Sequence, residues 1–83
     1  MKWFKDKILE RIGKYDKRRM VRTSRGWFVV YFKDGDVYCR HMKSVDKRYG
    51  LVYGKIELGI EIEYYNPRVG KKSIMGIIKE IKS

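Results

Sequence analysis

Positive charge is the strongest chemical signal in this sequence of 83 residues. Lysine and arginine number 21 against 10 acidic residues, which gives a formal net charge of +11 and an isoelectric point near 9.9. The excess is concentrated in residues 1–25, where ten basic side chains accompany three acidic ones. Such a field predicts an anionic partner, with nucleic acid first and an acidic membrane surface second.

Clustered lysine and arginine side chains are the candidates for phosphate contacts. A guanidinium group forms a forked pair of hydrogen bonds with phosphate oxygens, and lysine adds a point charge. A dense basic segment at 14–25 and two later basic loops supply such groups. The competing interpretation is a solvated, charge-rich surface without a ligand. The candidate phosphate-binding residues are Lys17, Arg18, Arg19, Arg22, Arg25, Lys47, Arg48, Lys71 and Lys72.

Aromatic rings offer a second kind of contact. If residues 27–42 form a hairpin, one of its faces combines aromatic planes with a cation. Proteins that bind single strands use this combination to stack bases and hold phosphates. The alternative is that a terminal helix packs over this face and makes the rings ordinary packing residues. The candidate stacking residues are Trp27, Tyr31, Tyr38 and Arg40.

Other reactive side chains do not form a recognisable catalytic or metal site. Cys39 and His41 lie two residues apart, but structural zinc needs four ligands and Cys–His catalysis needs an activating partner. The glutamates of residues 57–63 follow one strand face without a histidine, so we expect ion pairs there. Residues 70–73 lack the first glycine of a phosphate-binding loop, because position 65 is Tyr65. We therefore predict no enzyme, no metal, no cofactor and no small-molecule substrate.

A β-hairpin over residues 27–42 is the element expected to position these groups. Asp34-Gly35 lies between two runs of β-branched and aromatic residues and predicts a two-residue type I′ turn. Lys33 then pairs with Asp36, and alternate residues point to opposite faces. The predicted core face carries Phe28, Val30, Phe32, Val37 and Cys39, and the other face carries Trp27, Val29, Tyr31, Tyr38, Arg40 and Met42.

Three other segments have a clear period. Residues 1–15 place apolar side chains on one stripe and predict an amphipathic helix. Residues 55–65 alternate strictly and predict a strand. In residues 73–82 the isoleucines recur at i, i+3, i+4 and i+7, which predicts a helix. A closing strand is the alternative there, because β-branched residues and Gly76 lower helix propensity.

These elements predict a single α+β domain. An antiparallel sheet of four or five strands covers residues 19–65, with a helix at 1–15 and a second helix at 73–82. The predicted core consists of Phe28, Val30, Phe32, Val37, Ile56, Leu58, Ile60 and Ile62 from the sheet, with Phe4, Ile8, Ile77 and Ile81 from the helices.

The remaining composition bears on compartment and origin. A single cysteine, no long apolar run and no secretory leader predict a cytoplasmic protein. The chain has no alanine or glutamine and is rich in lysine, glutamate, isoleucine and tyrosine. This bias is typical of proteins from hot environments and, with the small size, would suit a viral or mobile-element protein.

We expect a small basic nucleic-acid-binding protein that contacts DNA or RNA mainly through phosphates and with little sequence preference. Two other functions stay open. One is a protein-interaction module, either a homodimer or an inhibitor of a nucleic-acid enzyme. The other, less favoured, is a membrane-surface protein that uses the N-terminal basic helix.

Overall fold

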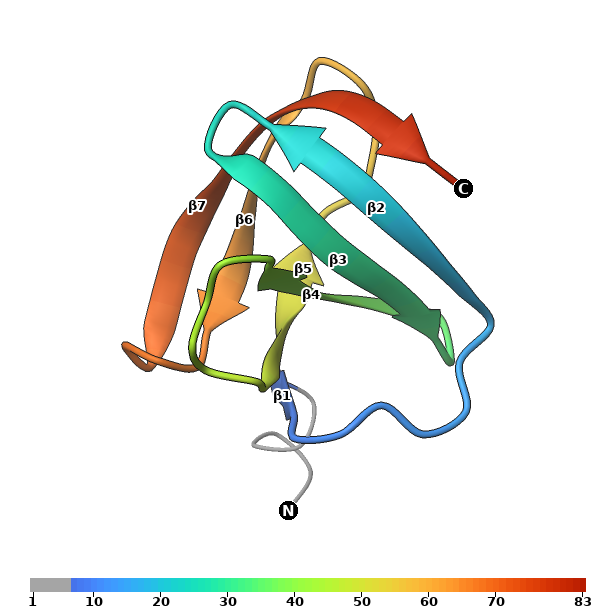
Figure 1. The fold of residues 1–83 in the computed structure, drawn as a ribbon, viewed down its shortest axis with the longest axis vertical. Coiled ribbons are helices and arrows are strands. Elements are labelled where there is room, and N and C mark those ends of the chain that lie inside the picture. Colours follow the sequence, from blue (N-terminus) through green and yellow to red (C-terminus); the bar gives the residue numbers. More distant parts are fainter. Residues whose placement is uncertain (1–6) are drawn as a thin grey trace.

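The computed structural model describes residues 7–83 as a closed antiparallel β-barrel (Figure 1). Strands β2 to β7 each pair with the next strand along the chain, and β7 pairs back with β2. The short β1 pairs with β5 beside the barrel. The strands are β1 (Ile8–Leu9), β2 (Lys17–Thr23), β3 (Gly26–Lys33), β4 (Asp36–His41), β5 (Tyr49–Tyr53), β6 (Glu61–Asn66) and β7 (Lys71–Lys82).

The hairpin β3–β4 forms with the predicted turn and register. Asp34 and Gly35 have φ angles of 52° and 84°, the positive values that a type I′ turn requires. Lys33 pairs with Asp36, and the ladder continues without a bulge from there. The turn residues therefore determine which side chains of both strands point into the barrel.

The barrel interior holds the main hydrophobic core. Each barrel strand points alternate side chains into the enclosed interior, so the inward-facing residues of all six barrel strands meet there. Three partly buried side chains, Phe32, Val37 and Ile56, pack against this core. Its buried members are Val21, Phe28, Val30, Cys39, Val52, Ile62, Tyr64, Met75 and Ile78.

The predicted helix over residues 1–15 is wrong for the part that the structure describes. Residues 8–15 are not helical, while residues 1–6, including Phe4, lie outside the described residues. Ile8 and Leu9 instead form β1, which pairs with β5. A helix of this length is marginal by itself, whereas the extended chain gains ladder hydrogen bonds and packs Leu9 and Ile12 on the barrel.

The predicted helix over residues 73–82 is also wrong, because this segment is β7, the strand that closes the barrel. β7 curves past both β6 and β2 (Figure 1) and contains an extra residue opposite each of them. The bulge opposite β6 places the buried Met75 and Ile78 three residues apart, a spacing that resembles a helical period. Closure supplies partners to two strand edges that a helix would leave open.

The predicted strand over 55–65 is half correct. Only β6 is extended, while Gly59 has a φ of 83° within a turn. Its N–H donates to the Ile78 carbonyl at 2.8 Å, so the turn lies against β7. Leu58 and Ile60 are consequently 64% and 44% exposed rather than part of the core. Two predicted helix residues, Ile77 and Ile81, are likewise exposed.

The fold is therefore all-β rather than α+β. The two predicted helices are replaced by strands for the same reason. β1 and β7 each form backbone hydrogen bonds with strands of the barrel. Among residues 7–83 there is no helix of the length and apolarity that a membrane crossing demands.

Candidate nucleic-acid interface

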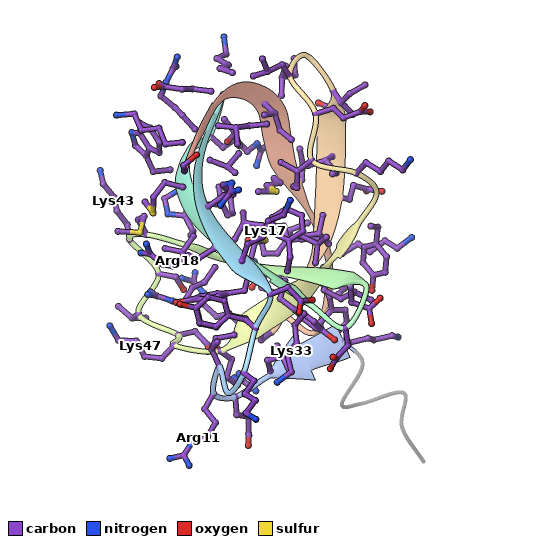
Figure 2. All side chains as sticks on the ribbon, turned by 90° about the vertical axis from the view of Figure 1, so that its right-hand side faces the viewer. Arg11, Lys17, Arg18, Lys33, Lys43 and Lys47 are labelled. Carbon is purple, nitrogen blue, oxygen red and sulfur yellow. The ribbon has the colours of Figure 1, made fainter. Side chains whose placement is uncertain are left out.

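Six basic side chains on one side of the barrel form the group that we call the cation face (Figure 2). They come from three separate places: the chain after β1, the strands β2 and β3, and the loop 42–48. Within residues 7–83 none of them has an acidic partner at ion-pair distance. The cation face consists of Arg11, Lys17, Arg18, Lys33, Lys43 and Lys47.

Strand β2 positions two members of the cation face over aromatic rings of β3. Lys17 pairs with Phe32 and Arg18 with Tyr31 in the β2–β3 ladder. The Lys17 Nζ lies 4.8 Å from the Phe32 ring centroid, and the Arg18 Cζ lies 6.0 Å from that of Tyr31. Both side chains remain exposed, so each charged group lies near a ring and stays accessible to solvent.

Three predicted phosphate-binding arginines have partners within the protein. Arg22 forms an ion pair with Glu80 at 3.1 Å, and Arg48 pairs with Asp46 at 2.7 Å. The Arg19 Nη1 donates to the carbonyl oxygen of Arg18 at 2.9 Å. The two ion-paired arginines therefore contribute less free positive charge than the members of the cation face.

The other predicted basic residues lie elsewhere. Arg25 is exposed in the turn between β2 and β3. Lys71 and Lys72 begin β7 beside the β6–β7 turn, across the barrel from the start of β2 (Figure 1). Lys72 lies over the Tyr53 ring at 4.6 Å. The structure thus separates these three from the cation face, which only Lys17, Arg18 and Lys47 join from the predicted set.

The aromatic face of the hairpin is largely covered, and Tyr38 is only 5% exposed. Val29, Tyr38 and Tyr49 form a second cluster on the outside of the barrel, against which Leu9 and Ile12 pack. The predicted alternative of a covered face therefore applies, although the cover is an extended segment and not a helix. The Tyr38 ring is not accessible to a nucleic-acid base.

Two other stacking candidates are partly covered. The Tyr31 ring makes edge contacts with Tyr15 and Tyr49, at centroid distances of 4.7 and 5.2 Å. Trp27 is half-buried beneath the Lys82 Nζ, 5.3 Å from its ring. Tyr15, which is not among the predicted stacking residues, is 47% exposed.

Arg40 is the last of the predicted stacking residues. Its Cζ lies 5.4 Å from the Tyr49 ring centroid on the outside of the barrel. Its buried Nε–H finds no hydrogen-bond acceptor among residues 7–83. Arg40 therefore packs on a protein ring and is not a free stacking group.

Arg11, Lys33 and Lys43 join the cation face without having been predicted. Lys33 could have been identified, because the hairpin register places it opposite Asp36 at the end of β3, beside the start of β2. Arg11 was assigned to the predicted helix over 1–15, but it lies in the non-helical part, residues 8–15. Lys43 lies in the loop 42–48, whose place depends on contacts with a distant turn.

Acidic side chains gather on another part of the barrel. Glu61 and Glu63 of β6 are exposed. In the strand order β6 is three strands away from β3, which places it on the opposite wall. Nearer to the cation face, the exposed carboxylates of Asp16, Asp34 and Asp36 lie beside Lys17 and Lys33 and form no ion pair with the described residues. The six cations outnumber these acids, so the face keeps a net positive field.

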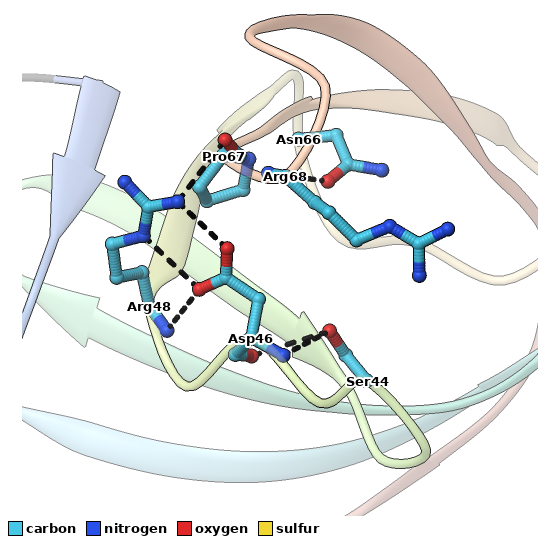
Figure 3. Close-up of polar contacts among 6 residues, drawn as sticks. All are labelled: Ser44, Asp46, Arg48, Asn66, Pro67 and Arg68. Carbon is cyan, nitrogen blue, oxygen red and sulfur yellow. Dashed lines mark hydrogen bonds and ion pairs between the residues drawn. The ribbon is translucent and has the colours of Figure 1, made fainter.

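Asp46 and Arg48 form a hydrogen-bonded ion pair, which we call the clasp, in the loop 42–48 that carries Lys43 and Lys47 (Figure 3). The Arg48 Nε and Nη2 donate to the two Asp46 carboxylate oxygens at 3.0 and 2.7 Å. The same Nη2 donates to the Pro67 carbonyl at 3.3 Å, joining the loop to the β6–β7 turn. The hydrogen bonds from Arg48 lower the pKa of Asp46, so the pair stays ionised at neutral pH.

Cys39 and His41 have structural surroundings. Cys39 is fully buried, and burial raises the pKa of its thiol. The His41 Nδ1 accepts from the Lys43 N–H at 3.0 Å, so Nε2 carries the proton and donates to the Arg25 carbonyl at 2.9 Å. Within residues 7–83 no three His, Cys, Asp or Glu side chains gather to hold a metal ion.

Comparisons of this chain with protein families, with curated proteins and with solved structures find no match.

Proposed function

We propose that this protein binds nucleic acid through the phosphate backbone at the cation face. The observation that carries the proposal is the convergence of six basic side chains from three segments, without acidic partners among residues 7–83. The exposed glutamates of β6 lie on the opposite wall of the barrel. The six cations outnumber the aspartates beside them, Asp16, Asp34 and Asp36, so a polyanion that approaches the cation face meets a net attractive field.

Binding of this kind is driven by counterion release. Each phosphate that a lysine or arginine neutralises releases condensed ions, so affinity falls steeply with salt. Phosphate contacts carry little sequence information. Base stacking has few rings to use, because Tyr38 is buried and Tyr31 is enclosed by Tyr15 and Tyr49. We therefore propose low sequence specificity, for DNA or RNA, in the reducing cytoplasm that suits the free thiol of Cys39.

The test compares two double variants that each reduce the net charge by two. Lys17→Gln/Arg18→Gln removes charge from the cation face, and Lys71→Gln/Lys72→Gln removes the same charge near the β6–β7 turn. Binding to labelled DNA and RNA, single- and double-stranded, is measured by fluorescence anisotropy at several salt concentrations. For duplex DNA, loss of two phosphate contacts lowers the slope of log affinity against log salt by about 1.8.

The expected result is a smaller slope and weaker binding in the β2 variant, with the β7 variant close to the unmodified protein. Equal losses in both variants would show that net charge, and not the cation face, drives binding. An unmodified protein that binds none of the four nucleic acids at low salt would overturn the proposal.

A further inference from the structure

We propose that a pocket between the loop 42–48 and the β6–β7 turn is a binding site for a phosphate group. The pocket has a volume of about 230 Å³, which is below the 300–1,000 Å³ typical of sites for drug-sized ligands. A small polyatomic anion suits this volume. The walls come from the end of β4, the loop and the turn, and include Arg40, Lys43, Asp46, Arg48, Asn66 and Arg68.

The charge of the pocket favours an anion. Four basic residues line it against a single acid, Asp46. That carboxylate is already held by two hydrogen bonds from the Arg48 side chain. Arg48 is thereby engaged with the protein, and the other three basic residues, Arg40, Lys43 and Arg68, leave an uncancelled positive charge around the space.

Four hydrogen-bond donors of the lining have no partner within residues 7–83. They are the Tyr64 hydroxyl, the Asn66 side-chain amide, the Arg68 guanidinium and the Lys43 ammonium. The Arg68 backbone N–H donates to the Asn66 Oδ1 at 3.1 Å, which leaves the Asn66 Nδ2 as a free donor. Arg68 extends from the turn away from the Asp46–Arg48 pair, and its guanidinium makes none of the contacts drawn in Figure 3.

This donor set suits a phosphate group better than a flat or singly accepting ligand. A phosphate group has several strong acceptor oxygens that point in different directions, and it forms forked hydrogen bonds with a guanidinium. The lining supplies donors from two separate segments and needs no movement of the clasp between Asp46 and Arg48. The ligand is either a free phosphate compound or the terminal phosphate of a nucleic-acid strand.

The pocket and the cation face share only Lys43, so the two proposals can fail separately. Arg68→Gln removes a pocket charge and leaves the cation face complete. Arg18→Gln removes an equal charge from the cation face and leaves the pocket complete. Asn66→Asp retains the oxygen that accepts from Arg68 and places a negative charge in the lining.

The experiment follows ¹⁵N-labelled protein by NMR during titration with inorganic phosphate at constant ionic strength, with chloride as the reference anion. We expect saturable shifts of the Arg68 Nε–H and Asn66 amide signals. Binding should weaken at least about tenfold in Arg68→Gln and be lost in Asn66→Asp, because each removes a charge-assisted or direct hydrogen bond. Arg18→Gln should bind phosphate like the unmodified protein.

Three further ligands identify the source of the phosphate group: adenosine monophosphate, a 5′-phosphorylated oligonucleotide and the same oligonucleotide with a 5′-hydroxyl. Pocket signals that respond only to the phosphorylated ligands support the site. Equal responses to both oligonucleotides, or phosphate shifts that do not saturate and spread over all basic residues, overturn it. An Arg68→Gln protein that keeps its spectrum and still binds phosphate unchanged would also overturn it.

Discussion

Aromatic rings stabilise many of the basic side chains of this protein without neutralising them. In residues 7–83 six cations lie over a ring, whereas three ion pairs are present, two of them on the same Glu80. A ring attracts a cation through its quadrupole but carries no opposite charge. The aromatic content therefore permits a high density of exposed positive charge, which is what a phosphate-binding surface requires.

Gly50 is a residue at which no side chain fits. A Cβ at this position would overlap the Tyr65 carbonyl oxygen and lie 3.4 Å from the Pro67 Cδ. We expect Gly50→Ala to lower the free energy of unfolding by about 3 kcal/mol, because rigid backbone must move. Urea denaturation followed by tryptophan emission measures this loss.

Gly59→Ala is the control for Gly50→Ala. Gly59 has a positive φ of 83°, but no atom would lie within 4 Å of its Cβ. It should cost only about 1 kcal/mol, the penalty of the backbone conformation. Equal costs for the two variants would contradict the close approach of β5 to the end of β6.

Asp46 should give the protein a pH-dependent contribution to stability. The hydrogen bonds from Arg48 lower its pKa in the folded state. The contribution is therefore fully present above the ordinary aspartate pKa of about 3.9 and is lost as the pH falls through the lowered value. Unfolding of the unmodified protein and of Asp46→Asn at pH 2 to 7 should show a stability difference that shrinks on acidification.

Asp36→Asn is the matched control, since Asp36 is exposed and forms no ion pair with the described residues. It should change stability little across the same pH range. A difference for Asp46→Asn that grows on acidification would show that the clasp does not stabilise the ionised carboxylate.

At the scale of elements, β7 unites the sheet by pairing with β6 in its first half and with β2 in its second. Its two bulges bend the strand, so that it can pair with both β6 and β2. At the first bulge Gly76 has a φ of 110°, and its Cβ would lie 2.7 Å from the Ser24 Oγ in the β2–β3 turn. The glycine thus allows β7 to approach this turn closely while it closes the barrel.

Two neighbouring isoleucines distinguish the strand from a helix at β7. A helix over 73–82 would bury both Ile77 and Ile78, whereas in the barrel Ile78 is 1% exposed and Ile77 is 42% exposed. We expect Ile78→Ala to cost about 2–5 kcal/mol of unfolding free energy and Ile77→Ala less than about 1 kcal/mol. Similar large losses in thermal or urea unfolding for both variants would contradict the strand.

The dimensions of the whole molecule limit the size of the proposed nucleic-acid site. Its longest extent is 35 Å, and duplex DNA rises about 3.4 Å per base pair. One molecule can therefore cover about ten base pairs at most. We expect affinity to rise with duplex length up to about this value and then to increase only through the number of available positions.

The length dependence can be measured with duplexes of 6 to 24 base pairs by anisotropy and by the stoichiometry at saturation. A second molecule should bind only when the duplex is about twice the length of a single site. A minimal duplex much longer than ten base pairs would require more than one molecule for each binding event and would contradict a site on a single barrel.

The sequence alone determined those features that depend only on residues close together in the chain. The Asp34-Gly35 turn predicted the hairpin register, which the structure confirms pair by pair. The large positive charge is likewise a property of composition alone. In each case the deciding residues lie within a few positions of one another, so no distant contact is needed.

Only the tertiary structure decided the form of residues 8–15 and 73–82 and the grouping of the cations. Apolar spacing predicted helices over 1–15 and 73–82, but closure of the sheet gives ladder partners to β1 and β7 that a sequence pattern does not show. The cation face gathers side chains from segments more than 30 residues apart. Such proximity depends on long-range strand pairing, which local propensity does not encode.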